Sequence, residues 1–251
     1  MSPSARTGWS RPPPSWATVW WHRTVSAVEP FPRDWRSCLV LVPHPDDPEY
    51  GIGAAVAKWT SQGKTVHYAL ASRGEQGIAG MMPEQAGPLR EIEQRRSAAI
   101  VGVEEVEFWA SPDSEIRNTP ALRATIVDTI TRVKPDVVVT IYSGPEWGPG
   151  APNQRDHIEF AKAVAQAYDS LSDPPRWLFE NGPEMTHGES VDGYLDHAVA
   201  SLAAHENYLR VLDPDTPVLE QARKQVEMAT PPHPDFGGAP TVGFILKRPP
   251  A

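Results

Sequence analysis

The chain has 251 residues, of which 40% are hydrophobic, and this length suits one α/β domain with a substantial core. Its 32 acidic and 23 basic residues give a formal charge of −9, which argues against a nucleic-acid partner, because phosphate binding needs clustered Lys and Arg. The single cysteine, Cys38, excludes a disulfide framework and a cysteine-based metal site, so a reducing, cytoplasmic compartment is expected. No segment approaches the length of a membrane span, so no membrane partner is expected.

Residues 1–34 are rich in Pro, Trp, Ser and Arg, and we expect an irregular arm there, followed by one domain over residues 35–251. The stretch from Trp16 to Trp21 is too short and too interrupted for a signal-peptide core. Trp16, Trp20 and Trp21 could pack on the domain or on a neighbouring subunit, and the alternative is a flexible terminus. These aromatic residues are the feature that suggests a homo-oligomer.

Short β-branched runs alternate with longer runs of helical period, which predicts a mostly parallel sheet covered by helices on both faces. Strands are expected at residues 38–42, 66–71, 106–110, 137–142, 177–180 and 241–247. Helices are expected at residues 47–63, 89–103, 120–133, 155–171, 194–209 and 218–228. A loop that contains Gly and Met, residues 73–87, follows the second strand and could act as a lid.

Four ionisable side chains crowd the turn after the first strand: His44, Asp46, Asp47 and Glu49. In open α/β sheets the carboxyl ends of the strands are where ligands bind. Adjacent carboxylates repel each other unless a cation or strong donors neutralise them. Zinc in hydrolytic sites takes three His or carboxylate ligands and leaves one position for water, and His44 and Asp47 can supply two of the three.

The third ligand is expected from another strand end. His157 lies at the start of the helix that follows the fourth strand, and Asp156 beside it could hold a ligand in place by hydrogen bonding. Asp46 is then a carboxylate beside the ligands, and we expect it to take a proton from the attacking water. The similar segment at residues 233–235 is expected to be a solvated turn, because no second Asp follows it.

These residues resemble the hallmarks of a known family. The His-Pro-Asp-Asp turn at residues 44–47 is similar to that of the bacterial LmbE-like and eukaryotic PIG-L-type N-acetylglucosaminyl de-N-acetylases. The resemblance implies a Rossmann-like, three-layer αβα fold in a single domain. It also implies one Zn²⁺ or another divalent metal per chain, bound by His44, Asp47 and His157, with Asp46 as the base. The family's later Asp-His pair matches Asp156 and His157.

Weaker similarities extend to about Leu209. They are a Gly-Glu turn at Gly74 and Glu75, an Arg-x-x-Glu pattern at Arg90 and Glu93 with Gly102 nine residues later, and a late helical His at His205. Many relatives carry a second His three residues before the metal-binding one, and here that position is Gln154. Because Gln cannot deliver a proton, the leaving amine would be protonated by Asp46 or by another group such as His205.

The expected reaction removes an N-acyl group, with acetyl as the expected group, from an amino sugar or related small molecule through a zinc-activated water. Asn153 or Gln154 could help to stabilise the oxyanion, and Trp147 could either stack on a sugar ring or anchor its loop. One alternative keeps the metal but acts on a non-sugar amide, a thiol-conjugate amide or a cyclic imide. A second is a non-catalytic nucleotide- or ligand-binding module, although Val56 stands where a small residue would be required.

Overall fold

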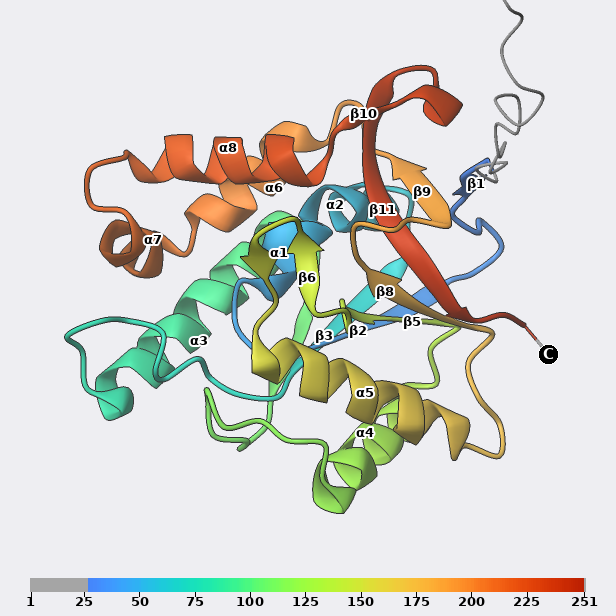
Figure 1. Ribbon diagram of the computed structural model, residues 1–251, viewed down its shortest axis with the longest axis horizontal. Coiled ribbons are helices and arrows are strands. Elements are labelled where there is room, and N and C mark those ends of the chain that lie inside the picture. The colour runs from blue at the N-terminus through green and yellow to red at the C-terminus, as the bar shows by residue number, and fades with distance from the viewer. Residues whose placement is uncertain (1–26, 251) are drawn as a thin grey trace, which may run out of the picture.

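The computed structural model describes residues 27–250, and its centre is a nine-stranded sheet (Figure 1). The strands of this sheet are β1 (Glu29–Pro30), β2 (Ser37–Val42), β3 (Thr65–Leu70), β4 (Glu105–Phe108), β5 (Val137–Ile141), β8 (Trp177–Asn181), β9 (His187–Ser190), β10 (Pro232–His233) and β11 (Ala239–Arg248). Their order is β1-β9-β11-β8-β5-β2-β3-β4, with β10 paired to β11. The strands from β8 to β4 run parallel, and β11 is antiparallel to both β8 and β9. A separate hairpin is formed by β6 (Glu146–Gly148) and β7 (Ala151–Pro152).

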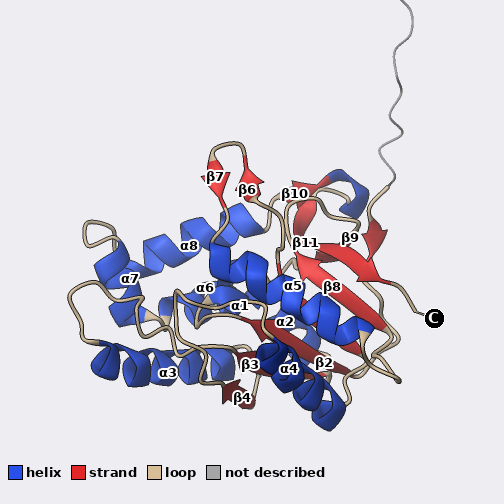
Figure 2. Cartoon of the chain, turned by 60° about the horizontal axis from the view of Figure 1, so that its bottom comes forward, coloured by secondary structure: helices blue, strands red, loops and turns tan. Residues whose placement is uncertain are grey.

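Helices cover both faces of the sheet (Figure 2). One face carries α1 (Asp47–Gly51), α2 (Gly53–Ser61), α3 (Pro83–Ile100), α6 (Leu195–Ala203) and α8 (Val218–Ala229), with α7 (Glu206–Leu212) beside them. The other face carries α4 (Pro120–Val133) and α5 (Arg155–Asp169). Alternate residues of β2 serve the two layers, since Val40 packs toward α2 and α6 whereas Leu39 and Leu41 pack toward α4 and α5. The predicted three-layer αβα fold is confirmed.

Two helices expected to be continuous are interrupted in the structure. The segment expected as one helix over residues 47–63 is divided at Ile52, between α1 and α2. Gly51 is the last residue of α1, and a Cβ atom there would lie 1.9 Å from Asn181 Oδ1, so a larger residue would displace the Asn181 side chain. The segment expected over residues 194–209 is divided before His205, whose φ of −79° and ψ of 49° end the helical path. Both interruptions lie next to the buried polar groups described below.

The loop expected over residues 73–87 is shorter than predicted, because α3 begins at Pro83. Proline is favoured in the first turn of a helix, where its missing N–H has no helical acceptor. Gly87 and Pro88 therefore lie inside α3, although their composition is typical of a loop. A Cβ atom on Gly87 would lie 3.4 Å from the Cβ atom of Glu75, so the small residue allows the helix to approach the preceding loop.

Only residues 27–34 of the expected N-terminal arm are described, and Trp16, Trp20 and Trp21 lie outside that part. Within residues 27–34, β1 pairs in parallel with β9. Phe31 is buried, and its ring centroid lies 4.6–4.9 Å from those of Trp59, Phe179 and Phe244. The domain boundary placed at residue 35 stays a prediction. Within residues 27–250 no helix is both long and apolar enough to cross a membrane.

Candidate metal centre

The candidate site lies at the carboxyl ends of the central parallel strands. β2 lies between β3 and β5. The strands that follow β2 are added first on its β3 side and then on its β5 side, and a reversal of this kind in an open parallel sheet forms a ligand-binding crevice at the carboxyl ends of the strands. His44 follows β2, Asp113 follows β4, and His157 lies in the first turn of α5, which follows β5. The strand order therefore brings together three side chains that are distant in sequence.

Ligand atoms of His44, Asp47 and His157 all lie within 4.8 Å of one another, as expected for side chains around one cation. His157 Nε2 is 3.2 Å from Asp47 Oδ1, and His44 Nδ1 is 3.5 Å from Asp47 Oδ2. Asp47 Oδ2 also accepts the His44 backbone N–H at 2.7 Å. Burial opposes the charge on Asp47, but His157 and His44 outweigh it and hold the pKa of Asp47 well below its usual value.

The orientation of the His157 ring is fixed by Asn153. The Asn153 amide nitrogen donates to the carbonyls of Tyr142 and Gly144, at 2.8 Å each, so its oxygen is the acceptor for His157 Nδ1 at 3.0 Å. In the neutral ring Nε2 then carries the lone pair, and this buried atom has no hydrogen-bond partner within residues 27–250. A lone pair facing a carboxylate oxygen fits a bound cation, so the donor set suits a divalent metal.

Two further carboxylates hold the His44 ring from the other side. Its Nε2 lies 3.2 Å from Asp113 Oδ1 and 3.3 Å from Asp156 Oδ2. Burial disfavours the charged ring, but hydrogen bonds to Asp113, Asp156 and Asp47 raise the pKa of His44 well above its usual value. His44, Asp113 and Asp156 also have the spacing of a metal site. A neutral imidazole has only one lone pair, so His44 can be a ligand in only one of the two groups, and in the group with Asp47 its Nε2–H would donate to Asp113 or Asp156.

Asp46 is buried beside this cluster but is not part of either candidate ligand group. Its φ of 78° places the backbone in the left-handed region, which non-glycine residues seldom adopt. Arg90 Nη2 lies 3.0 Å from Asp46 Oδ2 and also donates to the Pro45 carbonyl at 2.9 Å. Burial raises the pKa of Asp46 to about 6 against the opposing charge of Arg90, with a further rise from Asp47. A carboxylate with a pKa near neutrality suits a general base.

The structure brings several other predicted residues to this region. Glu75 Oε1 accepts the Asp113 backbone N–H at 2.9 Å, which links the Gly-Glu turn to His44. Gly74 has a φ of 63°, and a Cβ atom there would lie 2.3 Å from Arg90 Nη1, so Arg90 requires a glycine at this position. Trp147 donates its indole N–H to Asn153 at 3.0 Å, and its ring centroid lies 6.3 Å from that of His157.

Two predicted residues lie apart from the candidate ligands. Gln154 is exposed at the residue before α5, and its side chain makes no cap hydrogen bond. His205 is completely buried, with Nε2 3.4 Å from Glu49 Oε2, so its ring cannot touch a substrate directly. Both amide hydrogens of Asn153 are already donated to carbonyls, so stabilising an oxyanion would require it to break those bonds.

Two residues of this region were not identified from the sequence. Asp113 is isolated in an irregular loop, and its only signal was a position shortly after a predicted strand. Gln94 accepts the Asp46 backbone N–H at 2.7 Å from the middle of α3, where nothing in the local sequence distinguishes it from a surface residue.

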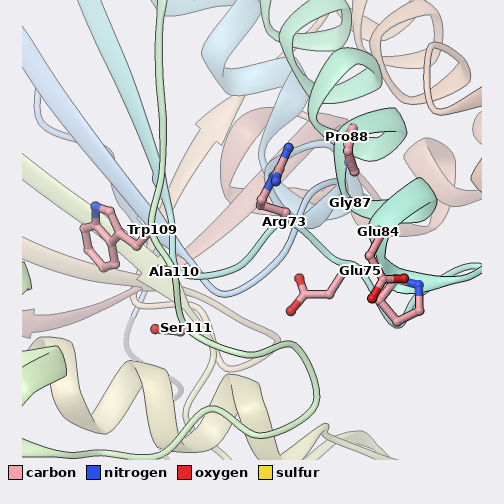
Figure 3. A pocket seen from close by; sticks show the side chains of 9 residues that line it. Arg73, Glu75, Glu84, Gly87, Pro88, Trp109, Ala110 and Ser111 are labelled. Atoms are coloured by element: carbon pink, nitrogen blue, oxygen red, sulfur yellow. The ribbon is translucent and has the colours of Figure 1, made fainter.

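Glu75 also lines a hollow of about 420 Å³. Figure 3 shows Arg73 and Glu75 between the chain after β4, which carries Ser111, and the start of α3, which carries Glu84. None of the candidate ligands lines this hollow, and its link to His44 runs through Glu75, which accepts the Asp113 backbone N–H, and through Asp113, which contacts His44. Its charged and hydroxyl side chains could form hydrogen bonds with a polar ligand.

Comparison with known proteins places this site in a family. The family model described as PIG-L, GlcNAc-PI de-N-acetylase, matches residues 39–168, just over half of the chain. The chain is 34% identical over 179 residues to a diacetylchitobiose deacetylase of Thermococcus kodakarensis, covering 69% of this chain and 61% of that protein. It is 27% identical over 188 residues to a probable N-acetyl-alpha-D-glucosaminyl L-malate deacetylase of Bacillus anthracis, covering 68% of this chain and 80% of that protein.

A solved structure supports the fold. The N,N'-diacetylchitobiose deacetylase of Pyrococcus horikoshii superposes with a TM-score of 0.70 at 16% identity, covering 85% of this chain and 84% of that one. The named relatives are deacetylases, which is the class of hydrolase expected from the sequence. The family match spans β2 to α5, including the His-Pro-Asp-Asp turn and the Asp-His pair. The chain therefore belongs to the PIG-L family.

Proposed function

We propose that this protein is a zinc-dependent deacetylase that removes an N-acetyl group from an amino sugar or a related small amine. One observation carries the proposal. His44, Asp47 and His157, which follow two different strands, place their ligand atoms within 4.8 Å of one another, and the buried carboxylate of Asp46 beside them belongs to neither candidate ligand group. Deacetylation of N-acetylated sugars is the activity named for its relatives in Thermococcus and Bacillus. A cytoplasmic location, expected from the lone and buried Cys38, is part of the same proposal.

His44, Asp47 and His157 would hold the zinc ion, with Asp113, Asp156 and Asn153 fixing the two imidazole rings. A bound zinc ion would supply Lewis acidity toward the amide carbonyl and would lower the pKa of water toward neutrality. Two His and one carboxylate form a ligand set found in hydrolytic zinc enzymes, and it leaves a position open.

Asp46 would take the proton of the attacking water and then return it to the leaving amine. Gln154 is exposed and carries no titratable proton, and His205 is buried behind Glu49. Asp46 has the raised pKa and the position next to the ligands that both transfers require. Arg90 would keep its carboxylate in one place during the two steps.

Trp147 and the hollow beside Glu75 would bind the rest of the substrate. The Trp147 ring is only partly buried, so a sugar ring could stack on it, while its hydrogen bond to Asn153 also anchors the loop. The volume of the hollow, about 420 Å³, is within the range of small-molecule pockets, and its Arg73, Glu75 and Ser111 side chains can hydrogen-bond to hydroxyl groups.

The test combines metal analysis with a substrate panel. Purified protein is expected to contain about one zinc per chain. It is expected to deacetylate N-acetylglucosamine or N,N'-diacetylchitobiose, measured as free amine, faster than it hydrolyses N-acetylated non-sugar amines, measured in the same way, or cyclic imides, measured as the ring-opened acid. Zinc without amine release from any sugar, but with turnover of a non-sugar amide or imide, would move the proposal to that substrate class. Protein that binds no zinc and hydrolyses nothing in the panel would refute it.

A further inference from the structure

Helix α3 presents two buried polar side chains to the turn that contains the proposed base. Arg90 and Gln94 lie four residues apart, so they project from the same face of the helix on successive turns, and they are 3% and 0% exposed. Arg90 contacts the carboxylate of Asp46, whereas Gln94 contacts its backbone. The proposed function uses Arg90 and leaves Gln94 without a role.

The orientation of the Gln94 amide is set by both of its partners. Its oxygen accepts the Asp46 backbone N–H at 2.7 Å, and its nitrogen donates to Glu49 Oε1 at 3.0 Å. If the amide were turned over, its NH₂ group would face an N–H and its oxygen would face a carboxylate, which is unfavourable at both ends. Glu49 is itself buried beside His205, at 3.4 Å between Oε2 and Nε2. The buried His205–Glu49 pair therefore holds the acceptor end of Gln94 toward Asp46.

Asp46 needs such support because its backbone conformation is unfavourable. A φ of 78° at a residue with a side chain persists only where the surroundings determine it. The Asp46 carbonyl accepts the N–H groups of Glu49 and Tyr50, at 2.9 Å each, which are the first bonds of α1. Gln94 satisfies the remaining backbone group of Asp46, its N–H, from a different helix. Without that acceptor the buried N–H would be unpaired, and the turn could relax toward negative φ.

We infer that Gln94 is a positioning residue for the proposed base, acting through the backbone of Asp46 and backed by Glu49 and His205. The inference rests on the proposed function for its catalytic consequence. Its structural consequence, the left-handed conformation of Asp46, stands without that function. Gln94 makes no hydrogen bond to His44, Asp47 or His157 and does not line the hollow beside Glu75, so its substitution acts on the site only through the Asp46 backbone, which lies between His44 and Asp47 in the turn.

The central test is Gln94→Met, which keeps the length of the side chain and removes both hydrogen bonds. We expect kcat per bound zinc to fall by roughly 10- to 100-fold, since a small misplacement of a reacting group can cost that much, while KM remains that of the parent. A crystal structure of this variant is expected to show Asp46 outside the left-handed region. An unchanged kcat together with an unchanged Asp46 conformation would overturn the inference.

A reciprocal exchange supplies the rescue. In the Glu49→Gln, Gln94→Glu double variant, the amide introduced at position 49 can donate to the carboxylate introduced at position 94, which still accepts the Asp46 N–H. We expect kcat to return to within about threefold of the parent, because the hydrogen-bond pattern around Asp46 is restored. If the folded, zinc-loaded double variant is as slow as Gln94→Met, the acceptor at position 94 is not what positions Asp46, and the inference is wrong.

Ser97→Ala is the matched control. Ser97 lies on α3, is also fully buried, and shares a 2.7 Å hydrogen bond with Ser201 rather than with the site. It is expected to lower the thermal stability without changing kcat per bound zinc. An equal loss of kcat in Ser97→Ala and Gln94→Met would show a general effect of weakening α3 and would overturn the inference. A parent protein inactive on every substrate would instead count against the proposed function, and the conformation of Asp46 in Gln94→Met would still test the role of Gln94.

Discussion

Asp46→Asn tests the proposed base with little change in shape. Asn is among the residues that tolerate the left-handed region, so the φ of 78° remains accessible. The Asp46 backbone keeps its bonds to Gln94 and to the first turn of α1. Arg90 loses an ionic partner but keeps the carbonyls of Pro45 and Gly74, at 2.9 and 3.2 Å. We therefore expect a folded protein that binds zinc as the parent does.

The expected loss is in turnover. General acid–base catalysis contributes about 10²- to 10⁴-fold, and Asp46 is proposed to carry both proton transfers, so we expect kcat to fall by about 10³- to 10⁴-fold, or about 4–5 kcal/mol. The uncompensated charge of the buried Arg90 should lower stability by about 3–5 kcal/mol, or about 6–20 °C in Tm. Amine release at saturating substrate measures kcat, and elemental analysis of the same sample measures zinc.

Asp136→Asn is the control for this change. Asp136 accepts the backbone N–H groups of Arg36 and Ser37, at 2.7 and 3.0 Å, at the amino end of β2, which is the end of the sheet away from the site. The same substitution there should reduce stability and leave kcat unchanged. A zinc-loaded Asp46→Asn protein that deacetylates at the parent rate would refute Asp46 as the base.

Three further predictions concern the ligands and their supports. His157→Ala should reduce the zinc content from about one per chain to nearly none, as measured by elemental analysis after dialysis, and full retention would exclude His157 as a ligand. Asn153→Leu should weaken zinc binding by about 10- to 100-fold in a chelator competition. Asn153→Asp keeps the acceptor for His157 and should weaken zinc binding less. Equal losses in the two variants would show that this acceptor does not orient the His157 ring. Gly74→Ala should lower Tm and reduce kcat, because its Cβ atom would lie 2.3 Å from Arg90 Nη1 at a φ of 63°, and a variant with parent Tm and kcat would show that Arg90 can move without consequence.

The features that the sequence predicted are those encoded in short segments. The residues from His44 to Asp47 are contiguous after an apolar strand, so their placement at a strand end follows from the pattern alone. His157 required one further step, the expectation that the third ligand comes from another strand end, and in the structure that strand, β5, lies beside β2. The fold class was accessible for the same reason, because each strand and helix has its own local period.

The features that were missed depend on contacts between distant segments. Gln94 appears in a hydrophilic helix among Glu93, Arg95 and Arg96, and its side chain is buried where α3 packs against the turn that carries Asp46 and Glu49. Asp113 contacts His44 from a loop whose path no local pattern specifies. The break before His205 was missed because the apolar period continues across it. Tertiary contacts determine these positions, so local propensity could not reveal them.

The exposed position of Gln154 agrees with the proposal that Asp46 alone carries both proton transfers. A site with a separate acid can divide its two proton transfers between two side chains, each of which needs to be positioned for only one step. Here Asp113 and Asp156 are engaged with His44, so Asp46 is the acid near the ligands that can take both. A single carboxylate that accepts a proton from water and returns it to an amine must stay within reach of both atoms. The three-point support of Asp46, at its N–H by Gln94, at its carbonyl by α1 and at its carboxylate by Arg90, meets that requirement.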